Sequence, residues 1–298
     1  MNYEEFKEVF LKEIQKHYDG SVVIEIKPVL RNNNYQYDGL YITKSSSDKV
    51  TPIINMNQVY ERCINERLEL KQCVIQVCQF RDEDHSNESM AEFINKLTNW
   101  EEVKEMVYPV LIATKGNEEL LSTLVTTPFL DLTVIYKVTE KDVNGEYSIK
   151  VSKAMLRKYG IIAEQLHEQA LKNLKRETYQ FISMDMFAMV RYFLDNSNNE
   201  NRTGVSKMYI LTSESLMYGA TGILDKELIK RLAGKKNYYV ILSSMHEALF
   251  VQDDGEIDTD RLNEIIADAH KHIVDKEEQL SDHYYHYSGE TGEISLEN

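Results

Sequence analysis

Residues 238–247 read Tyr-Tyr-Val-Ile-Leu-Ser-Ser-Met-His-Glu. Five apolar residues run directly into two hydroxyls, a histidine and a carboxylate. A short apolar run of this kind is typical of a strand that is buried on both faces. We therefore expect residues 238–242 to form an interior strand. We also expect the polar residues after it to be held at a fixed place in the fold.

The composition is that of a globular protein, and it disfavours two classes of partner. The chain has 298 residues, of which 42% are hydrophobic and 28% charged. Its formal net charge of −15 should repel the phosphates of nucleic acids and anionic lipid headgroups, so direct nucleic-acid binding is not expected. The alternative is an acidic face that binds a basic partner, as a mimic of nucleic acid. Glycine (12) and proline (4) are scarce, which favours many helices over a loop-rich β-sandwich.

The cysteines and the N-terminus predict a compartment. The three cysteines are Cys63, Cys73 and Cys78, and their spacing matches neither a disulfide framework nor a zinc site. We expect buried thiols in a reducing compartment. The first residues are acidic where a signal peptide would be basic, and no apolar run reaches the 18 residues needed to span a membrane. The sequence therefore predicts a cytoplasmic protein without a membrane partner.

Hydrophobic spacing predicts both helices and antiparallel strands in the first two thirds of the chain. Apolar residues recur at helical spacing over residues 3–17, and alternation over residues 21–30 and 37–43 predicts a hairpin. Residues 101–111 also carry apolar residues at helical spacing, with Pro109 expected to kink or end the helix. These patterns predict antiparallel strands covered by helices.

The last third of the chain has a different pattern. A Met- and Phe-rich helix is expected over residues 181–194, and the polar run 195–206 is the best candidate for a linker. Strand, helix and strand patterns follow it. The predicted fold class is α/β, or α+β by a stricter label: a mixed sheet covered by helices, with a smaller C-terminal strand–helix–strand unit. The expected parts are 1–195 and 205–290, with 291–298 as a frayed tail.

An ordered set of short blocks gives the chain a resemblance that covers nearly its whole length. The blocks are residues 37–42, 52–60, 131–136, 208–212, 219–220, 241–247 and 280–282. Together they resemble a bacterial family catalogued as domain of unknown function 5688, found mainly in Gram-positive anaerobes. The family pattern has a proline before the serine pair where this chain has Leu242. The resemblance implies a fold and a compartment but no activity.

The first candidate site is the polar end of the 238–247 stretch. A serine hydroxyl becomes a good nucleophile when a base takes its proton, and a histidine is the usual base near neutral pH. In an extended segment Ser244 and His246 would point to the same face, with Ser243 and Glu247 beside them. The simpler interpretation is that the serines cap a helix or form hydrogen bonds within the core.

The histidines offer a weaker, metal-binding hypothesis. His246 and Glu247 could join His283 or His286 as nitrogen and oxygen ligands. The His-Glu-x-x-His motif is not present, because Phe250 stands where its second histidine would be. Surface histidines are the simpler interpretation, so neither a metal nor another cofactor is expected.

Two further features have structural explanations. Asp131 and Asp282 each begin a predicted strand, where turns and caps account for them, although a close pair of carboxylates could do acid–base work. Gly219 and Gly222 precede a helix and could offer backbone N–H groups to an anion. Because the dinucleotide-binding and Walker patterns are missing, we expect a tight packing turn there.

The leading functional hypothesis is a non-enzymatic, protein-binding or regulatory module. It rests on the charge, on the 19 tyrosines, which suit protein interfaces, and on the missing catalytic motifs. One concrete version is a phage or mobile-element protein that inhibits a host defence complex, and a homo-oligomer is compatible with the sequence. The rival hypothesis is a hydrolase that uses His246 with Glu247 or a nearby serine.

Overall fold

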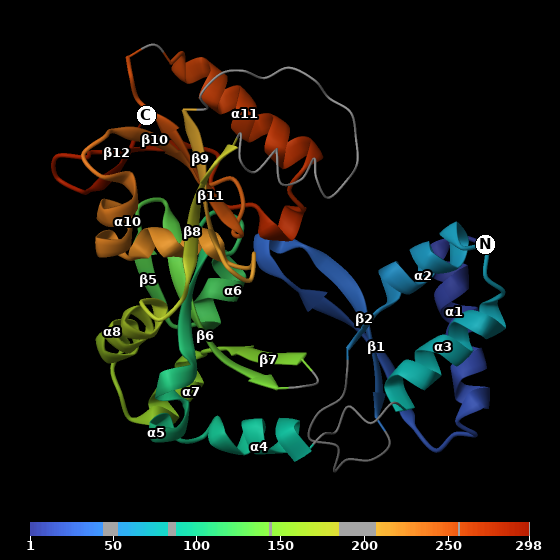
Figure 1. Cartoon of the computed structure of the whole chain (residues 1–298). Coiled ribbons are helices and arrows are strands. Elements are labelled where there is room, and N and C mark those ends of the chain that lie inside the picture. The colour runs from blue at the N-terminus through green and yellow to red at the C-terminus, as the bar shows by residue number, and fades with distance from the viewer. Residues whose placement is uncertain (44–52, 83–87, 143–144, 185–206, 256, 298) are drawn as a thin grey trace. The chain divides into compact units, whose positions relative to one another are not determined.

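The chain divides into two compact units. A computed structural model describes residues 1–43, 53–82, 88–142, 145–184, 207–255 and 257–297. The units are Met1–Asn95 and Lys96–Asn298 (Figure 1). The sequence placed a boundary between residues 195 and 205, whereas the compact units divide between Asn95 and Lys96. The physical reason is that strands on either side of residue 195 pair with each other in one sheet.

The first unit packs helices against a small antiparallel sheet. Strands β1 (Val23–Leu30), β2 (Gln36–Thr43) and β3 (Ile54–Asn55) lie in the order β1-β2-β3, with η1 (Asn32–Asn34) in the connection. Helices α1 (Tyr3–His17), α2 (Met56–Asn65) and α3 (Leu70–Asp82) contribute to one core with the sheet, and α4 (Glu88–Lys96) follows. The apolar stripe of α1 is buried, and it meets Leu40 and Ile42 of β2 in this core. The predicted helix and hairpin are confirmed.

A polar cluster joins α1 to the sheet. The Asp38 carboxylate on β2 accepts hydrogen bonds from the Tyr3 hydroxyl (2.9 Å) and the Lys7 ammonium (2.7 Å). The Asp38 amide donates to the side chain of Asn57 on α2 (2.9 Å). The hydrogen bond from Lys7 lowers the pKa of Asp38 below its ordinary value, so the carboxylate is held in its charged form. Asp38 therefore links three elements of this unit.

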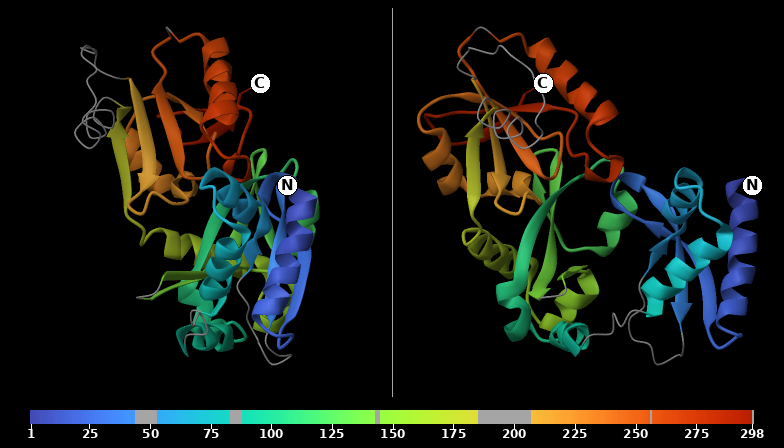
Figure 2. Two further views of the ribbon diagram at one scale, coloured as in Figure 1. Left: turned by 90° about the vertical axis from the view of Figure 1, so that its right-hand side faces the viewer. Right: turned by 45° about the vertical axis from the view of Figure 1, so that its right-hand side comes forward.

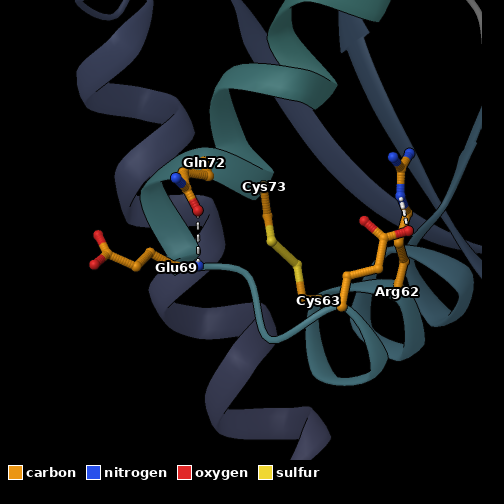
Figure 3. The surroundings of a disulfide bond; sticks show 6 residues. Arg62, Cys63, Glu69, Gln72 and Cys73 are labelled. Carbon is orange, nitrogen blue, oxygen red and sulfur yellow. Dashed lines mark hydrogen bonds and ion pairs between the residues drawn. A yellow bond between two sulfur atoms is a disulfide. The ribbon is translucent and has the colours of Figure 1, made fainter.

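The cysteines correct one prediction. Cys63, near the end of α2, and Cys73, near the start of α3, form a disulfide, and Cys78 is free and buried. Figure 3 shows the bond beside the turn where the Glu69 amide donates to the Gln72 side chain. The expectation of three thiols was wrong, because the pairing depends on how two helices approach and not on sequence spacing.

The second unit begins with a sheet built around one long strand. Strand β6 (Leu132–Asp142) pairs with β4 (Val107–Ala113) along one edge, and with β5 (Thr126–Phe129) and β7 (Gly145–Lys150) along the other. Helix α8 (Ala163–Leu174) packs on β4. The other short elements are α5 (Trp100–Val103), η2 (Lys104–Met106), α6 (Glu118–Thr123) and α7 (Lys153–Tyr159).

The helix predicted over residues 101–111 was wrong. Helix α5 ends at Val103, and residues 107–113 form strand β4, whose side chains are almost all buried. The valine and isoleucine run gains more from pairing with β6 than from helical spacing. Pro109 is tolerated because β4 is an edge strand, where a missing N–H leaves no ladder bond unmade.

A second sheet contains most of the apolar stretch 238–242. Its strand order is β13-β12-β10-β11-β9-β8, and every pair is antiparallel. Strand β10 (Tyr238–Ile241) lies between β11 (Glu247–Gln252) and β12 (Tyr284–Tyr287), and Val240 and Ile241 are fully buried. The predicted interior strand is confirmed. The remaining strands are β8 (Tyr179–Ser183), β9 (Met208–Ser213) and β13 (Ile294–Leu296).

Helices complete this sheet. Helix α11 (Thr259–His272) covers one face through Leu262 and Ile266, which pack on Ile241 and Val251. Between β9 and β10 the chain forms η3 (Gly219–Leu224) and α10 (Lys226–Ala233), and η4 (Lys276–Glu278) precedes β12. In Figure 2 this sheet, coloured yellow to red, lies beside the green first sheet of the same unit. The mixed α/β class is confirmed, and the stricter α+β label suits the antiparallel pairing.

Two other expectations are corrected near the sheet edges. Phe181 and Ile182 belong to strand β8 and not to a Met-rich helix, while residues 185–206, including the expected linker from 195, lie outside the described residues. The expected frayed tail includes β13, which pairs with β12. Within the described ranges, every helix is too short or too polar to cross a membrane.

Candidate functional site

The segment after β10 is held by backbone hydrogen bonds from two other parts of the chain. Ser243 accepts from the Leu280 amide (3.1 Å), and the Met245 amide donates to the carbonyl of Glu278 (2.9 Å). On the other side the Ala220 amide donates to the Met245 carbonyl (3.3 Å). Residues 243–245 are buried. The polar end of the strand is therefore fixed in place, as predicted, but it is packed inside.

Both ring nitrogens of His246 are engaged. The Tyr218 amide donates to His246 Nδ1 (3.3 Å), so that nitrogen acts as an acceptor. The proton then lies on Nε2, which faces a carboxylate oxygen of Glu278 at 3.1 Å. A general base needs a free lone pair directed at a substrate or nucleophile. In this arrangement His246 has no free lone pair. Its ring instead positions the backbone of Tyr218 by accepting the Tyr218 amide.

The two serines are also committed to the local structure. The Ser244 hydroxyl accepts from the His246 amide (3.0 Å), and it favours the charged form of the nearby Glu247 carboxyl. The Ser243 carbonyl is 2.9 Å from Nε2 of His270. Burial raises the pKa of Glu247 above its ordinary value, and the Ser244 hydroxyl opposes this only in part. These contacts support the interpretation of the serines as structural.

Asp131 and Asp282 belong to two different hydrogen-bonded groups. Asp131 accepts from the Ser281 hydroxyl (2.9 Å) and from the buried Tyr285 hydroxyl (2.5 Å). Asp282 is largely exposed and lies 3.4 Å from Nδ1 of His270. Asp131 therefore joins the start of β6 to the segment before β12. Neither carboxylate is hydrogen-bonded to His246, so a catalytic triad of these groups is not formed.

The metal candidates are not brought together. Nε2 of His286 lies 3.3 Å from an Asp253 oxygen, His246 contacts Tyr218 and Glu278, and His283 is exposed. Within the described ranges no group of three or more His, Cys, Asp or Glu side chains has a metal-binding arrangement.

The loop between β9 and η3 has a constrained backbone. The Ser213 hydroxyl accepts from the Met217 amide (3.2 Å) and donates to the Met217 carbonyl (2.8 Å), which closes the loop on itself. Leu216 (φ 59°) and Tyr218 (φ 56°) are both left-handed. Such conformations cost about 1–3 kcal/mol each for residues other than glycine, so the surroundings must impose them. The His246 ring supplies one constraint by accepting the Tyr218 amide.

Gly219 explains why the loop and the 243–247 segment can meet. A Cβ at this position would lie 2.4 Å from the His246 carbonyl oxygen and 2.7 Å from backbone atoms of Ser213 and Thr212. The Thr212 hydroxyl donates to the same His246 carbonyl (3.0 Å). Only glycine allows this approach. The predicted tight packing turn is confirmed.

A cavity of about 290 Å³ lies beside this loop, and Ser213, Ser215, Met217 and Tyr218 of the loop line part of it. It is bounded by strands β4, β6 and β7, the segment after α8, strand β8, and the loop. The Tyr218 hydroxyl is hydrogen-bonded to the Lys137 ammonium, which also lies 3.9 Å from the centre of the Tyr218 ring. Tyr218 thus connects His246, through its amide, to the cavity, through its phenol.

A second, more open groove of about 430 Å³ lies between β11 and α11. Of the residues chosen from the sequence, Ser243 and Glu247 line this groove. The other lining residues are the apolar Leu249, Ile265, Ala269, Ile273 and Val274 and the charged Arg261, Glu264 and Asp268. His246 lines neither this groove nor the cavity.

The sequence missed the residues that shape the cavity. Lys137, Tyr179 and Tyr218 look like ordinary strand or loop residues in the sequence. The only local signal was the pair Gly219 and Gly222, which pointed to close packing but not to what packs there. The tyrosine ring of residue 179 lies on Gly222, where a Cβ would be 2.6 Å from it.

Comparisons with known proteins give a family but no function. The sequence pattern of one family, described as "Family of unknown function (DUF5688)", matches residues 3–289. No curated protein matches the chain. No solved structure matches it either.

Proposed function

Because the chain belongs to the DUF5688 family of unknown function, relatives supply no activity, and we propose from geometry that it is a non-enzymatic protein-binding or regulatory module. Its recognition element in this proposal is the loop Ser213–Tyr218. The partner is another protein, and a host defence complex inhibited by a phage or mobile-element protein is one version.

The observation that carries the proposal is an exposed apolar pair on a constrained loop. Leu216 is 61% exposed and its neighbour Met217 is 51% exposed. The hydrogen bonds of Ser213 and the contact of Tyr218 with His246 fix the backbone that presents them. A loop that is already ordered loses less conformational entropy on binding. Exposed leucine and methionine side chains on such a loop suit a hydrophobic pocket of a partner.

The geometry at His246 supports binding over hydrolysis. An enzyme would need the histidine to accept a proton from a serine or from water, whereas both its nitrogens hold the loop and Glu278. Under the proposal His246→Ala lowers the unfolding temperature, since the Tyr218 amide loses its acceptor. Under the hydrolase hypothesis the same variant would keep its fold and lose turnover.

The proposal is tested with quantitative pull-downs from native bacterial lysate at moderate salt. The bait is the full chain, compared with a double variant, Leu216→Ser with Met217→Ser. The matched control is Ile162→Ser, because Ile162 is similarly exposed (59%) in the same unit but far along the chain from the loop. Unfolding temperatures of all three proteins must agree within a few degrees.

The expected result is a defined set of proteins that the wild type and the Ile162→Ser control retain and the loop variant loses at least tenfold. Equal recovery by the loop variant would show that the loop is not the recognition element. If the wild type retains nothing above background, protein binding itself is refuted.

A further inference from the structure

The cavity beside the recognition loop is lined by hydroxyl groups without a protein partner. Tyr108, Thr139, Tyr179 and Thr221 line it, and within the described part of the chain their side-chain hydroxyls form no hydrogen bond. Thr221 is the clearest case, since the residue is only 2% exposed and its hydroxyl is buried without a partner. A buried hydroxyl without a hydrogen bond destabilises the fold, so Thr221 favours a polar occupant, and the half-buried Tyr108, Thr139 and Tyr179 leave their hydroxyls open to it.

The two tyrosines are suited to act as donors. Burial is the largest cause that raises the pKa of Tyr179 and of Tyr108, and the nearby Glu177 carboxylate adds to it in both cases. Both phenols therefore remain protonated over the physiological range and can donate as well as accept. A ligand with its own hydroxyls can complement groups of this type in either direction.

The walls of the cavity combine aromatic rings with these polar groups. The Tyr179 ring lies on Gly222, and Tyr179 also lines the cavity. Tyr108 on β4 and Tyr218 on the loop provide further ring surface. Aromatic walls with a few placed polar groups are the usual construction of a small-molecule site, and about 290 Å³ is at the small end for one.

The charges that line the cavity balance. Lys137 and Lys141 are matched by Glu146 and Glu177, and Lys141 lies 3.4 Å from Glu146. A balanced lining does not select a strongly anionic or cationic ligand. It offers ammonium donors and carboxylate acceptors to the hydroxyls of a neutral one.

We infer that this cavity binds a sugar ring that carries several hydroxyls. The ring has polar edges for the four unpartnered hydroxyls and apolar C–H faces for the tyrosines. It could be a free monosaccharide or the ribose of a nucleoside, which share this chemistry. The inference does not depend on a protein partner, although Met217 of the recognition loop also lines the cavity.

The test is saturation-transfer difference NMR with the full chain, followed by calorimetric titration of any compound that binds. The probes are glucose, galactose, mannose, ribose, adenosine and uridine at up to 10 mM, with acetate, inorganic phosphate and lysine as charged controls. Two variants remove a cavity hydroxyl with little change of shape, Tyr179→Phe and Thr221→Val. The control is Tyr159→Phe, because the Tyr159 hydroxyl is also buried without a partner but does not line the cavity.

The expected result is binding of at least one sugar or nucleoside with a Kd of 1 mM or below. Affinity should fall at least fivefold in Tyr179→Phe and in Thr221→Val and stay within twofold in Tyr159→Phe. Binding of the monosaccharides alone identifies a free sugar, and binding of the nucleosides alone identifies ribose in a larger ligand.

Three results would overturn the inference. They are no binding by any sugar or nucleoside, binding that all variants retain, and binding of the charged controls alone. Because removing an unpaired hydroxyl does not disturb packing, Thr221→Val should unfold at or above the wild-type temperature, which keeps the test valid if Tyr179→Phe is unstable.

Discussion

Gly219→Ala should destabilise the second unit through backbone crowding. The added Cβ would lie 2.4 Å from the His246 carbonyl oxygen and 2.7 Å from backbone atoms of Ser213 and Thr212. Real Cβ atoms essentially never approach this closely, so two backbone segments must separate by roughly 1 Å. No flexible side chain can move aside to relieve the contact.

The magnitude follows from overpacking. Forcing extra atoms into a packed interior typically costs about 1–3 kcal/mol, and backbone neighbours place this site at the upper end or beyond. For a unit of this size about 1 kcal/mol shifts the unfolding temperature by roughly 2–4 °C, so we expect a decrease of about 6–12 °C. The separation also weakens the hydrogen bond from Thr212 to the His246 carbonyl, which is 3.0 Å long.

The assay is thermal unfolding followed by far-UV circular dichroism, with Gly160→Ala as the matched control. Gly160 has a left-handed φ of 67° and open space around its Cβ position, so its variant measures backbone strain without crowding. Strain of this kind costs about 1–2 kcal/mol. If Gly219→Ala unfolds at the wild-type temperature, or no lower than Gly160→Ala, the account of how the loop meets the 243–247 segment is wrong.

Three other perturbations have expected outcomes. Glu247→Gln should raise the unfolding temperature at pH 8, because burial raises the pKa of this carboxyl and its charge opposes folding above that pKa. The gain in unfolding temperature should disappear as the pH falls toward the ordinary pKa of 4.5. An equal gain at pH 8 and at pH 4.5 would contradict this. Asp38→Asn should lower the free energy of unfolding by up to about 1 kcal/mol at pH 7, because the hydrogen bond from Lys7 lowers the pKa of Asp38. This stability is present above the ordinary value of 3.8 and is lost as the pH falls through the lowered pKa. Urea unfolding curves of the variant and the wild type should therefore converge in acid. Reduction should destabilise the first unit by about 2.5–3 kcal/mol, because the bond between Cys63 and Cys73 closes a loop with a sequence separation of 10. Thiol titration of the unfolded, unreduced chain should find one free thiol, and finding three would refute the bond.

The sequence predicted elements whose pattern is set by burial alone. Residues 238–242 are apolar at every position because β10 is an interior strand, and that pattern cannot be mistaken for a surface element. Residues 107–113 were misread because their apolar residues also fit helical spacing. The choice between the two states is made by the partner strand β6, which local sequence does not reveal.

The candidate site was predicted in part. His246 was correctly placed at the end of a buried strand, but its role depends on the amide of Tyr218, a residue 28 positions earlier in the chain. A left-handed tyrosine has no sequence signature, so neither that contact nor the cavity beyond it could be read from the sequence. Glu278 likewise comes into reach only because the segment before β12 pairs with residues 243–245.

The constrained loop separates positions that can change from positions that cannot. Ser213 and Gly219 fix its two ends through backbone contacts, and substitution there would disturb two segments at once. Leu216 and Met217 are exposed, and their side chains do not take part in the hydrogen bonds that close the loop backbone. Randomising these two positions in a display library should therefore yield folded proteins with new binding preferences, which makes the loop a natural starting point for engineering the scaffold.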